Sequence, residues 1–165
     1  MRTGAAPGIA VALALAVAVV LQSSVLARLP LPGGAPSLVL VLVVAVGLIG
    51  GASAGLATGF AAGLLTDLLS AHPVGLLALC FALVGFVAGL LEADVERSVL
   101  LPMVVVAVAT LAVGLTYLAV LGLLGRQAAG GIADLPGTAV YDVMLTPFVF
   151  PLVAVAARRF VPARR

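Results

Sequence analysis

Long apolar stretches separated by short polar gaps make up nearly the whole chain. Six of them have the character of membrane-spanning helices, at residues 8–27, 37–49, 53–69, 74–91, 98–124 and 138–157. A helix needs roughly 20 apolar residues to cross a hydrocarbon core of about 30 Å. Residues 37–69 would overshoot that thickness as one helix, so we place a turn at Gly50 and Gly51. The pattern predicts an all-α, polytopic membrane protein, a compact six-transmembrane-helix bundle that forms a single domain over residues 1–165.

The first apolar stretch has two interpretations. Arg2, the apolar run that follows and the small residues ending at Ala27 are together typical of a cleavable signal peptide. However, the run over 8–27 is long for the hydrophobic region of a signal peptide and has the length of a span. Similar spans follow throughout the chain. We therefore expect an uncleaved first helix.

The arginines are unevenly divided between the polar gaps. With six spans, both termini lie on one side of the membrane, and this side receives six of the eight basic residues, all of which are arginines. Because cytoplasmic loops carry an excess of basic residues, we expect both termini in the cytoplasm. The arginines on that side are Arg2, Arg97, Arg158, Arg159, Arg164 and Arg165, and those on the other side are Arg28 and Arg126.

The composition excludes several classes of function. Hydrophobic residues make up 64% and charged residues 8%, which is too little charge to cover a soluble globule. The net charge is +2, and no basic run could follow a nucleic-acid backbone. Cys80 and His72 are each the only residue of their type, so a disulfide within the chain and a cysteine-type zinc site are excluded. No nucleophile-and-base pair or phosphate loop is present. We expect no enzyme activity, cofactor or metal.

Glycines recur at steps of four residues before and through the stretch 53–69. Small residues at this spacing let two helix backbones approach closely in lipid. Two further glycines in 74–91 repeat the pattern, which predicts that these two stretches pack on each other. The alternative is that glycine is simply frequent in membrane helices. The row is Gly47, Gly51, Gly55, Gly59 and Gly63, and the predicted helix-packing seam consists of Gly55, Gly59, Gly63, Gly85 and Gly89.

Two carboxylates lie at the edges of spans. Asp67 falls in the last turn of its helix, where the helix dipole opposes a negative charge. Three interpretations remain open for it: a cap on the turn that follows, a contact that holds a partner or the bundle, and a proton or cation relay. Asp142 is expected in the first turn of 138–157, where the dipole favours a carboxylate. Farther along, Pro147 and Pro151 should kink the last span and either open a groove or merely shape the bundle.

The order of short motifs resembles the rod shape-determining MreD family of bacteria. The motifs are Leu21-Gln22-Ser23-Ser24-Val25-Leu26, the entry Pro36-Ser37-Leu38-Val39-Leu40, the stretch from Gly59 through Asp67 to Ser70, and Pro73-Val74-Gly75-Leu76. The far half of the chain matches only in outline, through Asp142, the prolines and the arginines at the end. Two positions depart from the family: Ser37 replaces a frequent acidic residue, and Gly50-Gly51 is less polar than usual.

The resemblance implies a non-enzymatic member of the cell-elongation machinery in the bacterial inner membrane. Such a protein works with the bitopic protein MreC and, indirectly, with the actin homologue MreB, RodA and the elongation transpeptidase, in cell shape and lateral peptidoglycan synthesis. Its surroundings are membrane lipid, and no nucleic acid is implied. The family is also distantly similar to the substrate-binding subunits of energy-coupling-factor transporters. The alternative function is therefore a small-molecule-binding subunit of a vitamin-type transporter.

Overall fold

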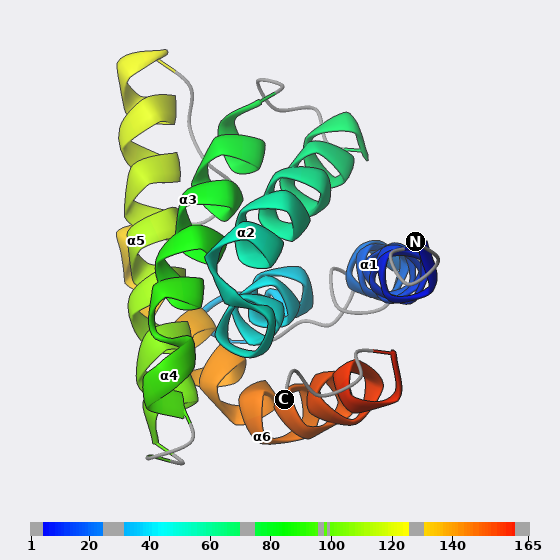
Figure 1. Ribbon diagram of the computed structural model, residues 1–165. Coiled ribbons are helices and arrows are strands. Elements are labelled where there is room, and N and C mark those ends of the chain that lie inside the picture. The colour runs from blue at the N-terminus through cyan, green and yellow to red at the C-terminus, as the bar shows by residue number, and fades with distance from the viewer. Residues whose placement is uncertain are drawn as a thin grey trace.

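The computed structural model describes residues 5–24, 32–69, 75–95, 98, 100–125 and 131–160. Throughout this part of the chain the regular structure is helical and contains no strand, which confirms the predicted all-α class (Figure 1). The elements are α1 (Ala5–Ser24), α2 (Leu38–Leu69), α3 (Leu76–Leu90), the short α4 (Glu92–Val95), α5 (Leu101–Leu123), the 3₁₀ turn η2 (Ile132–Asp134) and α6 (Leu135–Phe160).

Among the described residues, three stretches are long and apolar enough to cross a membrane: Leu38–Leu69, Leu101–Leu123 and Ile132–Ala156. Two shorter apolar helical stretches, Val11–Gln22 and Leu76–Leu90, accompany them. Large apolar side chains cover much of the outside of these helices; Phe148, for example, is 75% exposed. Exposed apolar surface of this extent is unfavourable in water but suits contact with lipid.

α2 consists of two helical segments that meet at Gly51. This residue has φ 82° and ψ 177°, a conformation that is essentially restricted to glycine. Figure 1 shows the first segment, in cyan, and the second, in teal, running in clearly different directions. The break falls within the turn that the Gly50-Gly51 pair predicts. It is sharper than a loop, because helix resumes directly after Gly51.

The first segment of α2 forms the centre of the hydrophobic core. Every residue from Val39 to Leu48 is buried. A helix that is apolar on all sides is stable only where protein or lipid surrounds it completely, and here protein does so. The side chains that pack in the same core come from four other helices and include Leu15 and Val19 of α1, Phe81 of α3, Val106 of α5 and Val149 of α6.

The remaining helices are arranged around α2. Figure 1 shows α5, α3 and the second segment of α2 side by side, with α1 on the side of α2 that faces away from α5. α6 packs against both α5 and α2. The closest of these pairings is α2 with α3, and it is the one that the glycine spacing predicts.

α6 begins earlier than the sequence pattern indicates. We expected the last span to begin at residue 138, after a loop, but the helix starts at Leu135. Pro136 is compatible with this start, because the first turn of a helix has no use for the N–H that proline lacks. Gly137 does not act as a breaker: a side chain there would clash with the backbone of Gly33, so the glycine allows the segment before α2 to lie directly on α6.

Candidate functional site

The second segment of α2 and α3 contact each other through their backbones. A methyl group added to any of three glycines on this face of α2 would clash with main-chain atoms of α3. Side-chain rotation could not relieve such a clash. The contacts are, in order along the helix, Gly55 with Gly85, Gly59 with Phe81, and Gly63 with Ala78.

The contact is reciprocal and extends past the break in α2. A side chain at Gly85 would meet the backbone of Gly55, and one at Gly89 would meet Ala52. Gly47, on the first segment of α2, also lies against this point, because a Cβ added at Gly55 would be 2.9 Å from its Cα. All five residues of the predicted seam therefore lie at the α2–α3 contact, and the two segments of α2 meet α3 at Gly47, Gly55 and Gly85.

Asp67 lies at the far end of this seam and caps α3. Its side chain is fully buried, at 0% exposure. Oδ2 accepts hydrogen bonds from the main-chain N–H groups of Gly75 at 2.8 Å and Ala78 at 3.1 Å, and Oδ1 accepts a longer one from Leu77 at 3.4 Å. Gly75 has φ 101°, a left-handed conformation that favours glycine. Of the three interpretations of Asp67, this geometry is that of a cap.

The position of Asp67 explains why a negative charge is tolerated at the C-terminal end of its own helix. The carboxylate lies at the C-terminal end of α2, where the dipole is unfavourable, but also at the N-terminal end of α3, where free N–H groups and the dipole both favour a negative charge. The glycine seam brings these two helix ends together. The seam and the cap therefore act on the same pair of helices.

Asp142 does not lie in the first turn of its helix, which corrects the expectation from the sequence. Because α6 starts at Leu135, the carboxylate is about two turns inside the helix. It is fully buried and accepts a hydrogen bond from the main-chain N–H of Ser37 at 2.6 Å and one from the hydroxyl of Thr110 at 2.7 Å. Asp142 therefore caps the N-terminus of α2 rather than that of α6.

Gln22 of α1 contributes a second cap to the same helix end. Its Oε1 accepts a hydrogen bond from the main-chain N–H of Val39 at 3.0 Å. Side chains of α1 and α6 thus bind the start of α2, and Thr110 of α5 bonds to one of them, Asp142. We call Gln22, Ser37, Thr110 and Asp142 the α2 cap.

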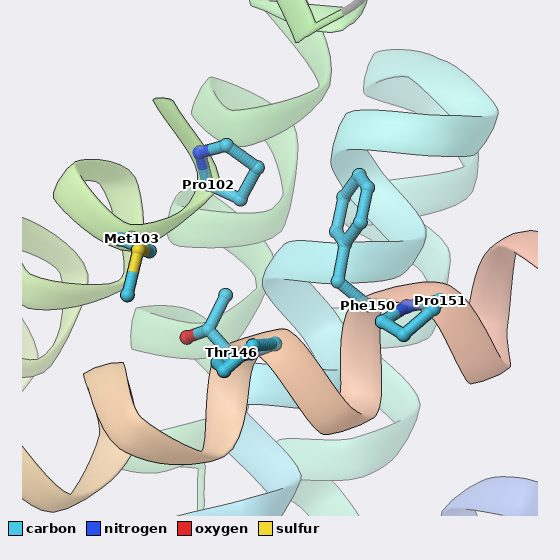
Figure 2. Close-up of a pocket in the computed structure, with 6 residues that line it drawn as sticks. Pro102, Met103, Thr146, Phe150 and Pro151 are labelled. Atoms are coloured by element: carbon cyan, nitrogen blue, oxygen red, sulfur yellow. The ribbon is translucent and has the colours of Figure 1, made fainter. Parts of the chain in front are cut away.

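Pro147 and Pro151 line a groove of about 200 Å³ between α5 and α6. Figure 2 shows Pro102 and Met103 of α5 across from Thr146, Phe150 and Pro151 of α6. Of the two consequences predicted for the prolines, the groove is present. Its lining is apolar apart from Thr146, whose hydroxyl donates to the main-chain oxygen of Asp142 at 2.9 Å. In the described residues, no group of three or more His, Cys, Asp or Glu could hold a metal ion.

Comparison with known protein families shows to which family the chain belongs. The family model of the rod shape-determining protein MreD matches residues 6–156, nearly the whole chain. The chain belongs to the MreD family. No curated protein and no solved structure matches it.

Membership in the MreD family, together with the apolar helices, identifies the chain as a membrane protein with a role in rod shape determination. MreD is not a known enzyme family. The matched range contains the glycine seam, both caps and the groove. Within it, the motif that carried the resemblance has a structural meaning, because Gly59 and Gly63 admit α3 and Asp67 caps it.

Two residues of the α2 cap were not singled out from the sequence. Thr110 is one of two threonines in an otherwise largely apolar helix, and Ser37 was noted only as a departure from the family pattern. The role of Thr110 is hard to predict from the sequence, because a threonine in a helix usually bonds to its own backbone. Its partner, Asp142, is 32 residues away.

Proposed function

We propose that this MreD-family protein is a non-enzymatic membrane scaffold that binds an MreC-type bitopic partner and thereby regulates the cell-elongation machinery. Through that partner it would act, indirectly, with MreB, RodA and the elongation transpeptidase in lateral peptidoglycan synthesis. The family match over residues 6–156 supports the part that concerns rod shape. The hydrogen bonds that the buried carboxylates make with helix ends support the proposal that the protein is a scaffold.

The observation that carries the proposal is that the two buried carboxylates bind helix ends. Asp67 is bonded to the start of α3, and Asp142 and Gln22 are bonded to the start of α2. In the described part of the chain, every buried polar side-chain atom has a hydrogen-bond partner. A ligand-binding subunit instead needs polar groups that converge on a pocket. The two buried carboxylates of this bundle hold helix ends rather than converge on a pocket, which favours a scaffold over a vitamin-type transporter subunit.

We also propose that the protein resides in the bacterial inner membrane and crosses it six times, with both termini in the cytoplasm. The six spans would be α1, the two segments of α2, α3, α5 and α6. The break at Gly51 and the location of six of the eight arginines on one side of this topology support the arrangement. A C-terminal reporter that is active only outside the cytoplasm would contradict it.

Partner binding is tested by co-purification from membranes of the native host. With an affinity tag on this chain and a mild detergent, we expect the MreC homologue to be retained in a fixed ratio to the bait. An unrelated bitopic membrane protein of similar abundance serves as the control and should be lost on washing. Purification of the chain alone, from membranes in which the MreC homologue is detected, would contradict the proposal.

The transporter alternative has its own test. If the chain were a vitamin-binding subunit, a vitamin or related metabolite should raise its thermal unfolding temperature in a saturable manner, because a ligand that binds only the folded state stabilises it. We expect no such rise across a panel of these compounds. A saturable shift with one of them would replace the scaffold proposal with the transporter function.

A further inference from the structure

The two buried carboxylates of the bundle face different kinds of hydrogen-bond donor. In the described residues, Asp67 accepts hydrogen bonds from the main-chain N–H groups of Gly75, Leu77 and Ala78. Asp142 accepts from one main-chain N–H, that of Ser37, and from the hydroxyl of Thr110. An N–H group can only donate, whereas a hydroxyl can donate or accept. The described partners of Asp142 therefore include a group that could accept a hydrogen bond from a protonated carboxyl group, and those of Asp67 do not.

A proton on Asp67 would have no acceptor among these partners. A proton on Oδ2 of Asp142 meets no such obstacle. The protonated oxygen could donate to Oγ1 of Thr110, 2.7 Å away, while Oδ1 still accepts from Ser37. No hydrogen bond of the α2 cap would be lost.

The hydroxyl hydrogen of Thr110, once it is no longer donated to Asp142, also has a hydrogen-bond acceptor within its own helix. Helical threonines commonly donate to the carbonyl oxygen four residues earlier. Four threonines of this chain do so in the described helices, and Thr110 instead donates to Asp142. The carbonyl oxygen of Val106 is the corresponding acceptor on α5. The four threonines and their acceptors are Thr66 with Ala62, Thr116 with Ala112, Thr138 with Asp134 and Thr146 with Asp142.

We propose that Asp142 and Thr110 form a proton-responsive clamp on the N-terminus of α2. Asp142 takes up a proton from solvent while the bundle remains folded, and the bond to Thr110 reverses its direction. The step is simple proton uptake, in which the carboxylate becomes a neutral carboxyl group. Because a hydrogen bond to a charged acceptor is stronger than one to a neutral acceptor, the clamp holds Ser37 more tightly when Asp142 is ionised.

The clamp lies beneath the segment that precedes α2. This segment is exposed at Pro32 and Gly33 and lies against α6. On α6 and the turn before it, the titratable residues nearest in sequence are Tyr141, whose hydroxyl donates to the carbonyl oxygen of Pro32 at 3.0 Å, and Asp134, which accepts from the N–H of Gly131. α1 and α2 contribute the non-titrating Gln22 and Ser37, and α5 contributes Thr110. Arg28 and Arg126, in neighbouring gaps of the sequence, lie outside the described residues.

The test is infrared spectroscopy of the full chain in lipid nanodiscs, titrated from neutral to mildly acidic pH, with circular dichroism to verify that the helices persist. We expect a carbonyl-stretching band of a protonated carboxyl group that appears reversibly on acidification. The band should be lost in Asp142→Asn and kept in Asp134→Asn. A lasting ion pair between Asp142 and an arginine would suppress the band, and that result would overturn the proposal.

A second pair of variants tests the role of Thr110 even if Asp142→Asn fails to fold. Thr110→Val keeps the shape of the side chain but removes the hydroxyl, so the band should move to higher wavenumber as the carboxyl group loses its acceptor. Thr110→Ser restores the hydroxyl and should return the band to its position in the wild type. A band that neither Thr110 variant moves would show that Asp142 and Thr110 do not form the clamp.

Discussion

The substitution Gly55→Leu is expected to prevent α2 and α3 from packing and to lower the free energy of unfolding by about 3 kcal/mol or more. The reason is the backbone contact at this point. A Cβ added at Gly55 would be 2.6 Å from the carbonyl carbon of Gly85 and 2.9 Å from the Cα of Gly47. These are main-chain atoms, so relief requires two helices to move apart. That movement would also separate Asp67 from the start of α3.

Gly122→Leu provides the matched control for Gly55→Leu. Gly122 also lies within a membrane helix, α5, but a Cβ added there would have no atom within 4 Å. Because glycine is a poor helix former, the control should be neutral or more stable by about 0.5–1 kcal/mol. Unfolding can be followed by circular dichroism in mixed micelles, since the chain has no tryptophan. If Gly55→Leu and Gly122→Leu were equally stable, the close backbone contact between α2 and α3 at Gly55 would be contradicted.

The substitution Asp67→Ala should lower the free energy of unfolding by about 3 kcal/mol, because it leaves buried N–H groups at the start of α3 without a partner. Three N–H groups now bond to this carboxylate, and its complete burial means that water cannot replace it without opening the bundle. Asp67→Asn retains one carbonyl oxygen and the side-chain volume. Its loss of stability should therefore be smaller, about 1–2 kcal/mol.

Asp134→Ala is the control for Asp67→Ala. The carboxylate of Asp134 also binds a main-chain N–H, that of Gly131, but this bond lies at the surface. Water can replace it, so the loss of stability should stay at or below about 1 kcal/mol. The same unfolding measurement applies to all three variants. If Asp67→Ala were no more destabilising than Asp134→Ala, the buried cap would have no special role in stability.

Features that depend on nearby residues could be predicted from the sequence. The apolar periodicity predicts helices, and Gly50-Gly51 predicts the break because glycine readily adopts the conformation found at Gly51. The four-residue spacing of Gly55, Gly59 and Gly63 places them on one helix face, where a second helix can approach. The residues that produce each of these signals lie within about two helical turns of one another. The predictions therefore do not depend on which helices later pack together.

Features that depend on long-range pairing could not be predicted. Asp142 was expected in the first turn of its own helix, but it caps α2 through Ser37, which is 105 residues away. Nothing near either residue specifies that contact. The start of α6 was misplaced for a related reason, since Gly137 resembles a breaker until its contact with Gly33 is known.

The groove, too, could be predicted only in the part that depends on residues close together in the sequence. Pro147 and Pro151 predict a disturbance of the last helix, because each lacks the N–H that the helix would use. The opposite wall, with Pro102 and Met103, belongs to α5 and follows only from the packing of α5 on α6. The complete burial of the first segment of α2 is also a property of the assembled bundle. Its apolar sequence is equally compatible with a lipid-facing span.

The scaffold role is tested most directly by depleting the protein in its native host and measuring cell width together with the incorporation of new wall material. We predict that depletion abolishes the normal cell shape and the ordered insertion of lateral wall. Wild-type protein and Gly122→Leu should restore both, whereas Gly55→Leu should restore neither. Unchanged shape and wall insertion after complete depletion would contradict the role proposed for this chain.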